Sequence, residues 1–205
     1  MSRRKHAKSS QDAIYEAALD EFAEYGLAGA RVDRIARRAG INKAMIYYHF
    51  GSKQSLYDAV VKDIAETALA GVRGSIGRTA TLEDVLLAMA RSHVEGFGRG
   101  TRTSRILLHE LAAGGRTFER IVAGLGAREE LKSVITEMIE AGKREGRYRD
   151  VDTLHAVISF LGMSIFYLMV SPMADKVWGT AGDAEFKQRR PQAVVDLFMH
   201  GLEAR

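Results

Sequence analysis

An all-α fold of about nine helices is predicted for this chain of 205 residues. Apolar residues recur along most of it with the 3.6-residue period of a helix. Only two prolines, Pro172 and Pro191, interrupt the chain. The composition, 46% hydrophobic and 27% charged, is typical of a globular protein. A chain of this length can form one sizeable domain or two small ones.

The first helix is expected over residues 10–26. Its apolar face would consist of Ile14, Ala18, Phe22 and Tyr25. Gly26 is a suitable end, because glycine adopts positive φ without a steric cost. Residues 1–9, which precede this helix, are basic and are not followed by an apolar stretch. We therefore expect a disordered basic arm and not a signal peptide.

Two short helices around a tight turn are predicted next, at about 33–39 and 43–49. Gly40 suits the turn, and the side chain of Asn42 can accept a backbone N–H as N-cap of the second helix. This is the layout of a helix-turn-helix, whose second helix enters the major groove of DNA.

The net charge of the chain is concentrated near its N-terminus. Residues 1–53 carry ten Lys or Arg and six Asp or Glu, whereas residues 54–205 carry twenty of each. Such a basic module favours binding to a polyanion. A basic run is more often only a solvated face, but the turn chemistry makes DNA binding the better interpretation.

The outward face of the second short helix follows from its periodicity. If Ile46 is buried, steps of 100° per residue turn Ala44, Met45, Tyr47 and Tyr48 outward. Flanking cations could reach phosphates. The full set of predicted DNA-binding residues is Arg31, Arg34, Asn42, Lys43, Ala44, Met45, Tyr47, Tyr48, His49 and Lys53.

Several short segments follow one another in a recognisable register. They are Ile14–Ala18, Phe22–Gly26, Val32–Ala36, Ala39–Lys43, Ile46–Phe50, Ser52–Lys53 and Leu56. In this register the chain resembles the TetR family of bacterial transcriptional regulators over roughly residues 10–70. The family usually has Thr or Ser in place of Arg31, and often Gly followed by Thr or Ser in place of Ala44 and Met45. Base reading by Met45 would have to be apolar, for example against a thymine methyl group.

The remaining helices follow from periodicity and from glycine, proline and N-cap positions. Further helices are expected over about 52–72, 81–97, 103–113, 117–145 (one or two), 153–170, which ends at Pro172, and from Pro191 onward, with a loop over 174–185. We therefore expect a DNA-binding domain over 10–55, a linking helix over 53–73, and a ligand-binding and dimerisation domain over 74–205.

The segment 156–170 is the most apolar in the chain. It is shorter than the roughly 20 residues that span a membrane, so we expect a buried helix. The resemblance implies that the last two helices form a four-helix bundle with a twofold mate; alternatively, they only fill the core of the monomer. The predicted interface residues are Val157, Leu161, Val194, Phe198 and Leu202.

The resemblance also implies a ligand cavity in the second domain. The candidate lining residues are His93, Phe97, Leu107, His109, Met138, Phe160, Met163, Phe166 and Tyr167. Methionine and phenylalanine at helical spacing belong more often to an ordinary core than to a pocket. A hydrophobic or amphipathic molecule would suit such residues, because Met adapts to irregular apolar shapes.

No enzymatic or metal site is predicted from the motifs. The pair His109-Glu110 is not followed by a second histidine at ligand spacing, and neither a GxSxG elbow nor a P-loop occurs. No cofactor is therefore expected. The chain contains no cysteine, which fits a reducing cytoplasm.

Together these patterns predict a cytoplasmic, homodimeric DNA-binding regulator, with repression of an inverted-repeat operator as the leading hypothesis. A small molecule bound in the second domain would release it from DNA. One alternative is a regulator of the same fold without a small-molecule effector. Another, from a different class, is an all-α carrier of apolar ligands or an enzyme whose basic face is incidental.

Overall fold

The computed structural model describes residues 9–75, 80–96, 102–180 and 183–204. These ranges contain helices and no β-strand, which confirms the all-α prediction. The helices are α1 (Ser10–Gly29), α2 (Val32–Ala39), α3 (Lys43–Phe50), α4 (Lys53–Ser75), α5 (Leu82–Gly96), α6 (Arg102–Ala112), α7 (Arg116–Gly124), α8 (Ala127–Arg144), α9 (Thr153–Trp178) and α10 (Ala184–Leu202). The predicted basic arm lies outside the described residues, apart from Ser9.

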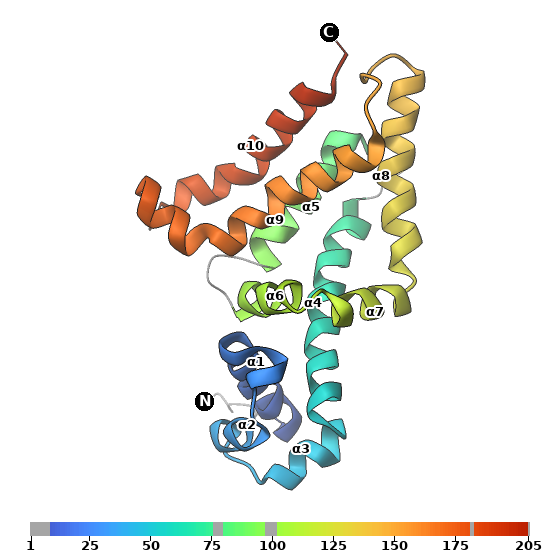
Figure 1. Cartoon of the computed structure of the whole chain (residues 1–205). Helices are drawn as coiled ribbons and strands as arrows, with labels where there is room; N and C mark the ends of the chain where they lie inside the picture. Colours follow the sequence, from blue (N-terminus) through green and yellow to red (C-terminus); the bar gives the residue numbers. More distant parts are fainter. Residues whose placement is uncertain (1–8, 76–79, 97–101, 181–182, 205) are drawn as a thin grey trace, which may run out of the picture.

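Helices α1–α3 form a small head, and α4 leads from it into a larger helical body (Figure 1). In the body, α5, α8, α9 and α10 surround a second apolar core. Helices α6 and α7 lie between head and body, where α6 packs along α1 and α7 packs along α4. The head core extends into α6, because Ile106 and Leu107 belong to the same buried cluster as Ile14 and Ile46.

Helix α1 differs from its predicted end. Gly26 leaves the helical conformation, at φ 62° and ψ −177°, but the chain adds a further turn as far as Gly29. The Ala30 N–H then donates to the Gly26 carbonyl at 3.1 Å. The start of this helix carries a capping box between Ser9 and Asp12, which occupies N–H groups that a helix start leaves without partners.

The predictions at the two prolines were wrong. Helix α9 does not end at Pro172 but continues to Trp178, so residues 174–178 of the expected loop are helical. A proline inside a helix costs about 3 kcal/mol. Burial on both sides of it offsets this cost, because Ser171, Ala174 and Asp175 are all buried.

Pro191 does not lie in the first turn of the last helix either. The N-cap of α10 is Asp183, whose side chain accepts the Phe186 N–H at 2.9 Å. Pro191 is therefore an interior residue of α10, and it is buried. The last helix therefore begins at the Asp183 cap and not at the proline.

Helix α9 also contains a stretch, Thr153–Ser171, that is long and apolar enough to cross a membrane by length and composition, with mean hydropathy 1.8. A single such helix is weak evidence, because core helices of soluble proteins pass the same test. Only 18% of this stretch is buried, so the expectation of a buried helix is wrong for the single chain. The helix packs against α8 and α10 on one side.

Candidate nucleic-acid interface

A buried carboxylate fixes the first helix of the helix-turn-helix against α1. Glu21 has no exposed surface, and its Oε1 accepts the Arg31 N–H at 2.8 Å and the Arg34 Nε at 2.7 Å. Arg34 also donates to the Gly29 carbonyl at 2.8 Å, and its guanidinium lies 3.9 Å above the ring of Tyr25. The side chain of Arg31, the N-cap residue of α2, makes no capping hydrogen bond. The start of α2 is instead held by Glu21, which accepts the backbone N–H of Arg31.

The turn and the start of α3 agree with the sequence prediction. Gly40 has φ 68°, a left-handed conformation that disfavours other residues. Asn42 is the N-cap of α3, and its Oδ1 accepts the Ala44 N–H at 2.9 Å. Ile46 is fully buried beneath the helix, which fixes the rotation of α3 about its axis.

The rotation of α3 decides which of its side chains can meet a ligand. Ala44 is exposed, and Tyr47 and Tyr48 are 45% and 81% exposed. Met45 and His49 are half-buried, so they lie at the edge of this face. Large aromatic side chains exposed on a short helix are unusual for a solvated surface and are typical of a contact surface.

The basic residues of the head fall into two groups. Arg31, Arg37, Arg38 and Lys43 are exposed, and Arg38 lies 3.9 Å from Asp20 and 3.7 Å from Glu24. Lys43 pairs with Asp33 at 2.8 Å, and this hydrogen bond holds the pKa of Asp33 below its ordinary value. An exposed pair of this kind is weak, so Lys43 can exchange its partner for a phosphate.

The second group is engaged within the protein. Lys53 donates to the Leu27 carbonyl at 2.8 Å and to the Ala30 carbonyl at 3.1 Å, and so ties the start of α4 to the end of α1. Arg34 is held by Glu21. In this conformation the side chains of Lys53 and Arg34 stabilise the head, and their donors are not directed toward a DNA phosphate. Their contacts with DNA remain predictions.

The sequence did not predict two features: the burial of Glu21 in the head, and the contact of Tyr57 with Glu110 at the junction of head and body. Glu21 lies seven residues after Ile14 on the buried face of α1, so helical periodicity could have revealed a buried acid. The contact of Tyr57 with Glu110 spans 53 residues, and no local pattern indicates it.

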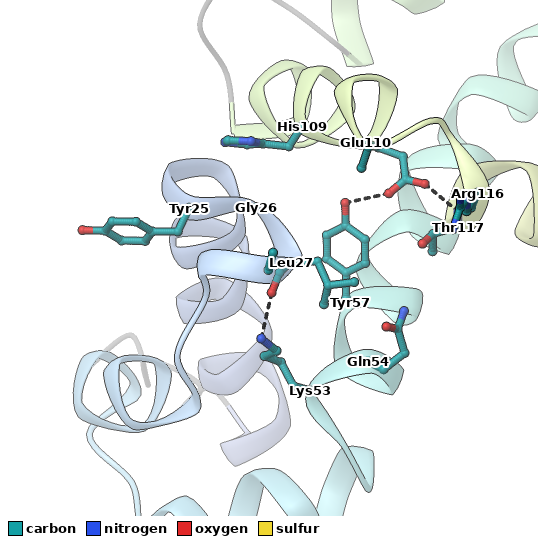
Figure 2. A pocket seen from close by; sticks show the side chains of 12 residues that line it. Tyr25, Gly26, Leu27, Lys53, Gln54, Tyr57, His109, Glu110, Arg116 and Thr117 are labelled. Carbon is teal, nitrogen blue, oxygen red and sulfur yellow. Dashed lines mark hydrogen bonds between the residues drawn. The ribbon is translucent and has the colours of Figure 1, made fainter.

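That contact joins α4 to the body (Figure 2). The Tyr57 hydroxyl donates to Glu110 Oε2 at 2.9 Å, and Glu110 Oε1 accepts the backbone N–H groups of Thr117 at 2.6 Å and Phe118 at 3.1 Å. Burial, followed by the hydrogen bond to Glu110, raises the pKa of Tyr57. One buried carboxylate therefore caps α7 and anchors the linking helix.

The predicted ligand-binding residues do not line a single cavity. Met163, Phe166 and Tyr167 line an open cleft of about 430 Å3 between α9 and α10. His109 instead lines a separate cleft of about 520 Å3 between head and body. Leu107 belongs to the head core, Phe160 and Met138 belong to the body core or pack against it, and Phe97 lies outside the described residues.

His93 is the predicted pocket residue with the most unusual environment. It is buried in α5, and this burial lowers the pKa of its imidazole to about 4. The side chain is therefore neutral at pH 7 and can act as both donor and acceptor.

The structure corrects the choice of interface residues. Val194, Phe198 and Leu202 lie in the protomer's own core, and Val157 and Leu161 pack against it. The alternative that these positions fill the monomer core therefore holds for the α10 residues. The exposed apolar side chains of α9 and α10 are instead Leu154, Ile158, Phe166, Met173, Val177, Trp178 and Leu197.

The head matches a known family model. The model described as bacterial regulatory proteins, tetR family, covers residues 14–60. Along nearly its whole length, the chain is similar to the HTH-type transcriptional regulator RutR of Escherichia coli, at 27% identity over 207 residues, covering 99% of this chain and 95% of RutR. It is also similar to the HTH-type transcriptional repressor NicS of Pseudomonas putida, at 28% identity over 80% of this chain and 78% of NicS.

Solved structures share the whole fold. The ketosteroid transcriptional regulator KstR2 of Mycobacterium tuberculosis superposes with a TM-score of 0.74, at 21% identity over 98% of both chains. With the exposed face of α3 above its glycine turn, these likenesses define a helix-turn-helix transcriptional regulator that binds DNA. Within that class, the DNA-binding head of this chain, over residues 14–60, matches the TetR family of bacterial regulatory proteins.

Proposed function

We propose that this regulator is a repressor that binds an inverted-repeat operator as a homodimer and leaves it when a small molecule binds the body. The observation that carries the proposal is the exposed face of α3, with its two tyrosines beside a basic surface. The similarity to NicS, which is named a repressor, supports the sign of regulation.

On DNA, α3 enters the major groove with Ala44 and Tyr47 toward the base edges. The small side chain of Ala44 allows close approach, and the Tyr47 hydroxyl reaches a base edge or a phosphate. Arg31, Arg37 and Lys43 surround this face and neutralise phosphates. Arg37, which is exposed on α2, is an addition to the residues expected from the sequence.

The dimer forms through the exposed apolar stripe of α9, with Leu197 of α10 beside it. Ile158, Phe166 and Met173 are each more than half exposed and follow one another along one side of the helix. Apolar surface of this extent is costly in water, and a second copy of the chain covers it. Twofold packing then sets two α3 helices to read two half-sites.

The effector site that we propose is the cleft between α9 and α10. Its walls are largely apolar, and they include Met163, Tyr167 and Phe186. Arg190 adds a polar group to this cleft. Its guanidinium donates to the Met163 carbonyl at 3.2 Å and lies 5.0 Å from the centre of the Tyr167 ring, which fixes its position. Phe166 borders both this cleft and the α9 stripe, so a ligand here can alter the packing of the two copies.

Selection of bound sequences from a random duplex library tests the proposal. Enriched sequences should be inverted repeats with half-sites one helical turn apart, or a multiple of it. Enrichment of single half-sites would contradict the dimer. Binding of inverted repeats that no apolar ligand releases would favour the alternative regulator without a small-molecule effector. No enrichment at all would favour a carrier or an enzyme.

A further inference from the structure

The cleft between head and body has walls from three separate parts of the chain. They are the end of α1 with Tyr25 and Leu27, the start of α4 with Lys53, and the α6–α7 corner with His109 and Arg116 (Figure 2). The cleft measures about 520 Å3, which is within the range of sites for small molecules. It is distinct from the α9–α10 cleft, with which it shares no residue.

The charged groups of this cleft differ in their capacity for new partners. Glu110 is its only carboxylate, and both its oxygens already accept hydrogen bonds from Tyr57, Thr117 and Phe118. Arg116 is exposed, and its side chain makes no hydrogen bond or ion pair with any described residue. Lys53 uses two of its three donors on backbone carbonyls. The charged donors that remain free for a new partner are therefore those of Arg116 and Lys53, and no carboxylate of the lining competes for them.

Apart from Gln54, His109 and Thr117, the rest of the lining is apolar or aromatic. Leu27, Ala28 and Ala113 contribute side chains, and Gly26 contributes backbone. Gly26 lies so close to α6 that a Cβ there would be 3.1 Å from His109 Nδ1. The two walls thus approach each other closely at Gly26.

We infer that this cleft binds a small organic carboxylate with an apolar body. The guanidinium of Arg116 can hold the carboxylate through two parallel hydrogen bonds, and the ammonium of Lys53 adds a second positive charge. The apolar body lies against Leu27 and Ala113. A neutral molecule of the same shape offers neither cation a negatively charged partner, and it therefore binds less tightly.

Occupancy of this cleft affects the angle between head and body. A ligand that touches α1, α4 and the α6–α7 corner together has different contacts in different orientations of the head, so it favours one of them. This part of the inference rests on the proposed function, because its readout is DNA binding. The binding site itself does not depend on that function.

Titration calorimetry with benzoate, at constant ionic strength set with NaCl, tests the site in the full-length protein. Benzamide is the neutral control of the same shape. We expect benzoate to bind at least tenfold more tightly than benzamide, and Arg116→Ala to weaken benzoate binding at least tenfold. Arg105→Ala removes an exposed arginine of the neighbouring helix α6 that does not line the cleft, and it should change the affinity less than twofold.

A second variant locates the site independently of charge. Ala113→Phe fills the cleft and keeps both cations, and it should also weaken benzoate binding at least tenfold. Equal affinities for benzoate and benzamide, or wild-type affinity in Arg116→Ala or Ala113→Phe, would overturn the site. Affinity for the selected duplex should change at least threefold when benzoate is saturating, and an unchanged value would overturn the coupling. A protein that binds benzoate but no duplex would refute only the proposed function.

Discussion

Replacement of Glu110 by leucine should destabilise the junction between head and body more than any single change on the surface. The side chain is 4% exposed and accepts three hydrogen bonds, from the Tyr57 hydroxyl and from two backbone N–H groups at the start of α7. Leucine accepts none of them. Tyr57 and Thr117 are buried, so water cannot readily replace the lost partner.

The expected cost follows from those two donors. A buried donor left without a partner costs about 1–3 kcal/mol, so Glu110→Leu should lower the free energy of unfolding by about 2–6 kcal/mol. Tyr57→Phe removes one donor and leaves the carboxylate bound to α7, and it should cost about 1–2 kcal/mol. The double variant should cost less than the sum of the two, because phenylalanine leaves no hydroxyl without a partner.

Urea unfolding of the four proteins, followed by circular dichroism at one protein concentration, measures these differences. Glu137→Leu is the matched control, because Glu137 is an exposed glutamate of α8. It should stay within about 0.5 kcal/mol of the wild type. The reasoning is refuted if Glu110→Leu stays within the same limit, or if the two single changes are strictly additive.

Three further results are expected. Ile158→Glu should give monomers by sedimentation, whereas Leu108→Glu, an exposed leucine of α6, should leave the dimer intact; the reverse pattern would contradict the α9 interface. Lys53→Ala should lower the free energy of unfolding by about 1–3 kcal/mol, because two carbonyls lose a charged donor; unchanged stability with weaker DNA binding would restore the phosphate role. Burial lowers the pKa of His93 to about 4, so between pH 6.5 and 4 this imidazole is protonated in the unfolded chain but not in the folded one. The free energy of unfolding should therefore fall by about 2 kcal/mol from pH 7.5 to 5. The variant His93→Leu should lose this part of the pH dependence.

Local signals predicted the head well. Gly40 and Asn42 act through their own backbone and their nearest neighbours, so the turn and the start of α3 could be predicted from residue type alone. The burial of Ile46 followed from helical periodicity in the same way. These three residues determine which face of α3 is exposed.

Long-range contacts could not be predicted in the same way. Lys53 and Arg34 looked like phosphate ligands because they are basic and near the turn, but their partners lie 26, 23 and 13 residues away along the chain. Phe198 was expected at the interface because the family resemblance implies that the last two helices form a bundle with a twofold mate. Its actual neighbours, which include Phe160 at 5.4 Å between ring centres, follow from the packing of α9 on α10.

Tertiary packing also outweighed proline at two positions. Pro172 and Pro191 are strong local signals for a helix end or start, yet both lie inside helices. Ser171, Ala174 and Asp175 beside Pro172 are buried, and Pro191 is itself buried. This burial offsets the lost backbone hydrogen bond. Predicting a helix end or start from a proline alone therefore fails where packing against other helices stabilises the helix around that proline.

The salt dependence of binding to the selected duplex tests the central claim, that the α3 face binds DNA, most directly. Each head exposes Arg31, Arg37 and Lys43, so a dimer can neutralise about six phosphates. A plot of log K against log salt concentration should then fall with a slope of about −5. Tyr47→Ala should weaken binding by more than about 1 kcal/mol at every salt concentration and leave the slope unchanged, because it removes a contact and not a charge. A slope near zero, or wild-type affinity in Tyr47→Ala, would contradict the assignment of α3 as the DNA-reading helix.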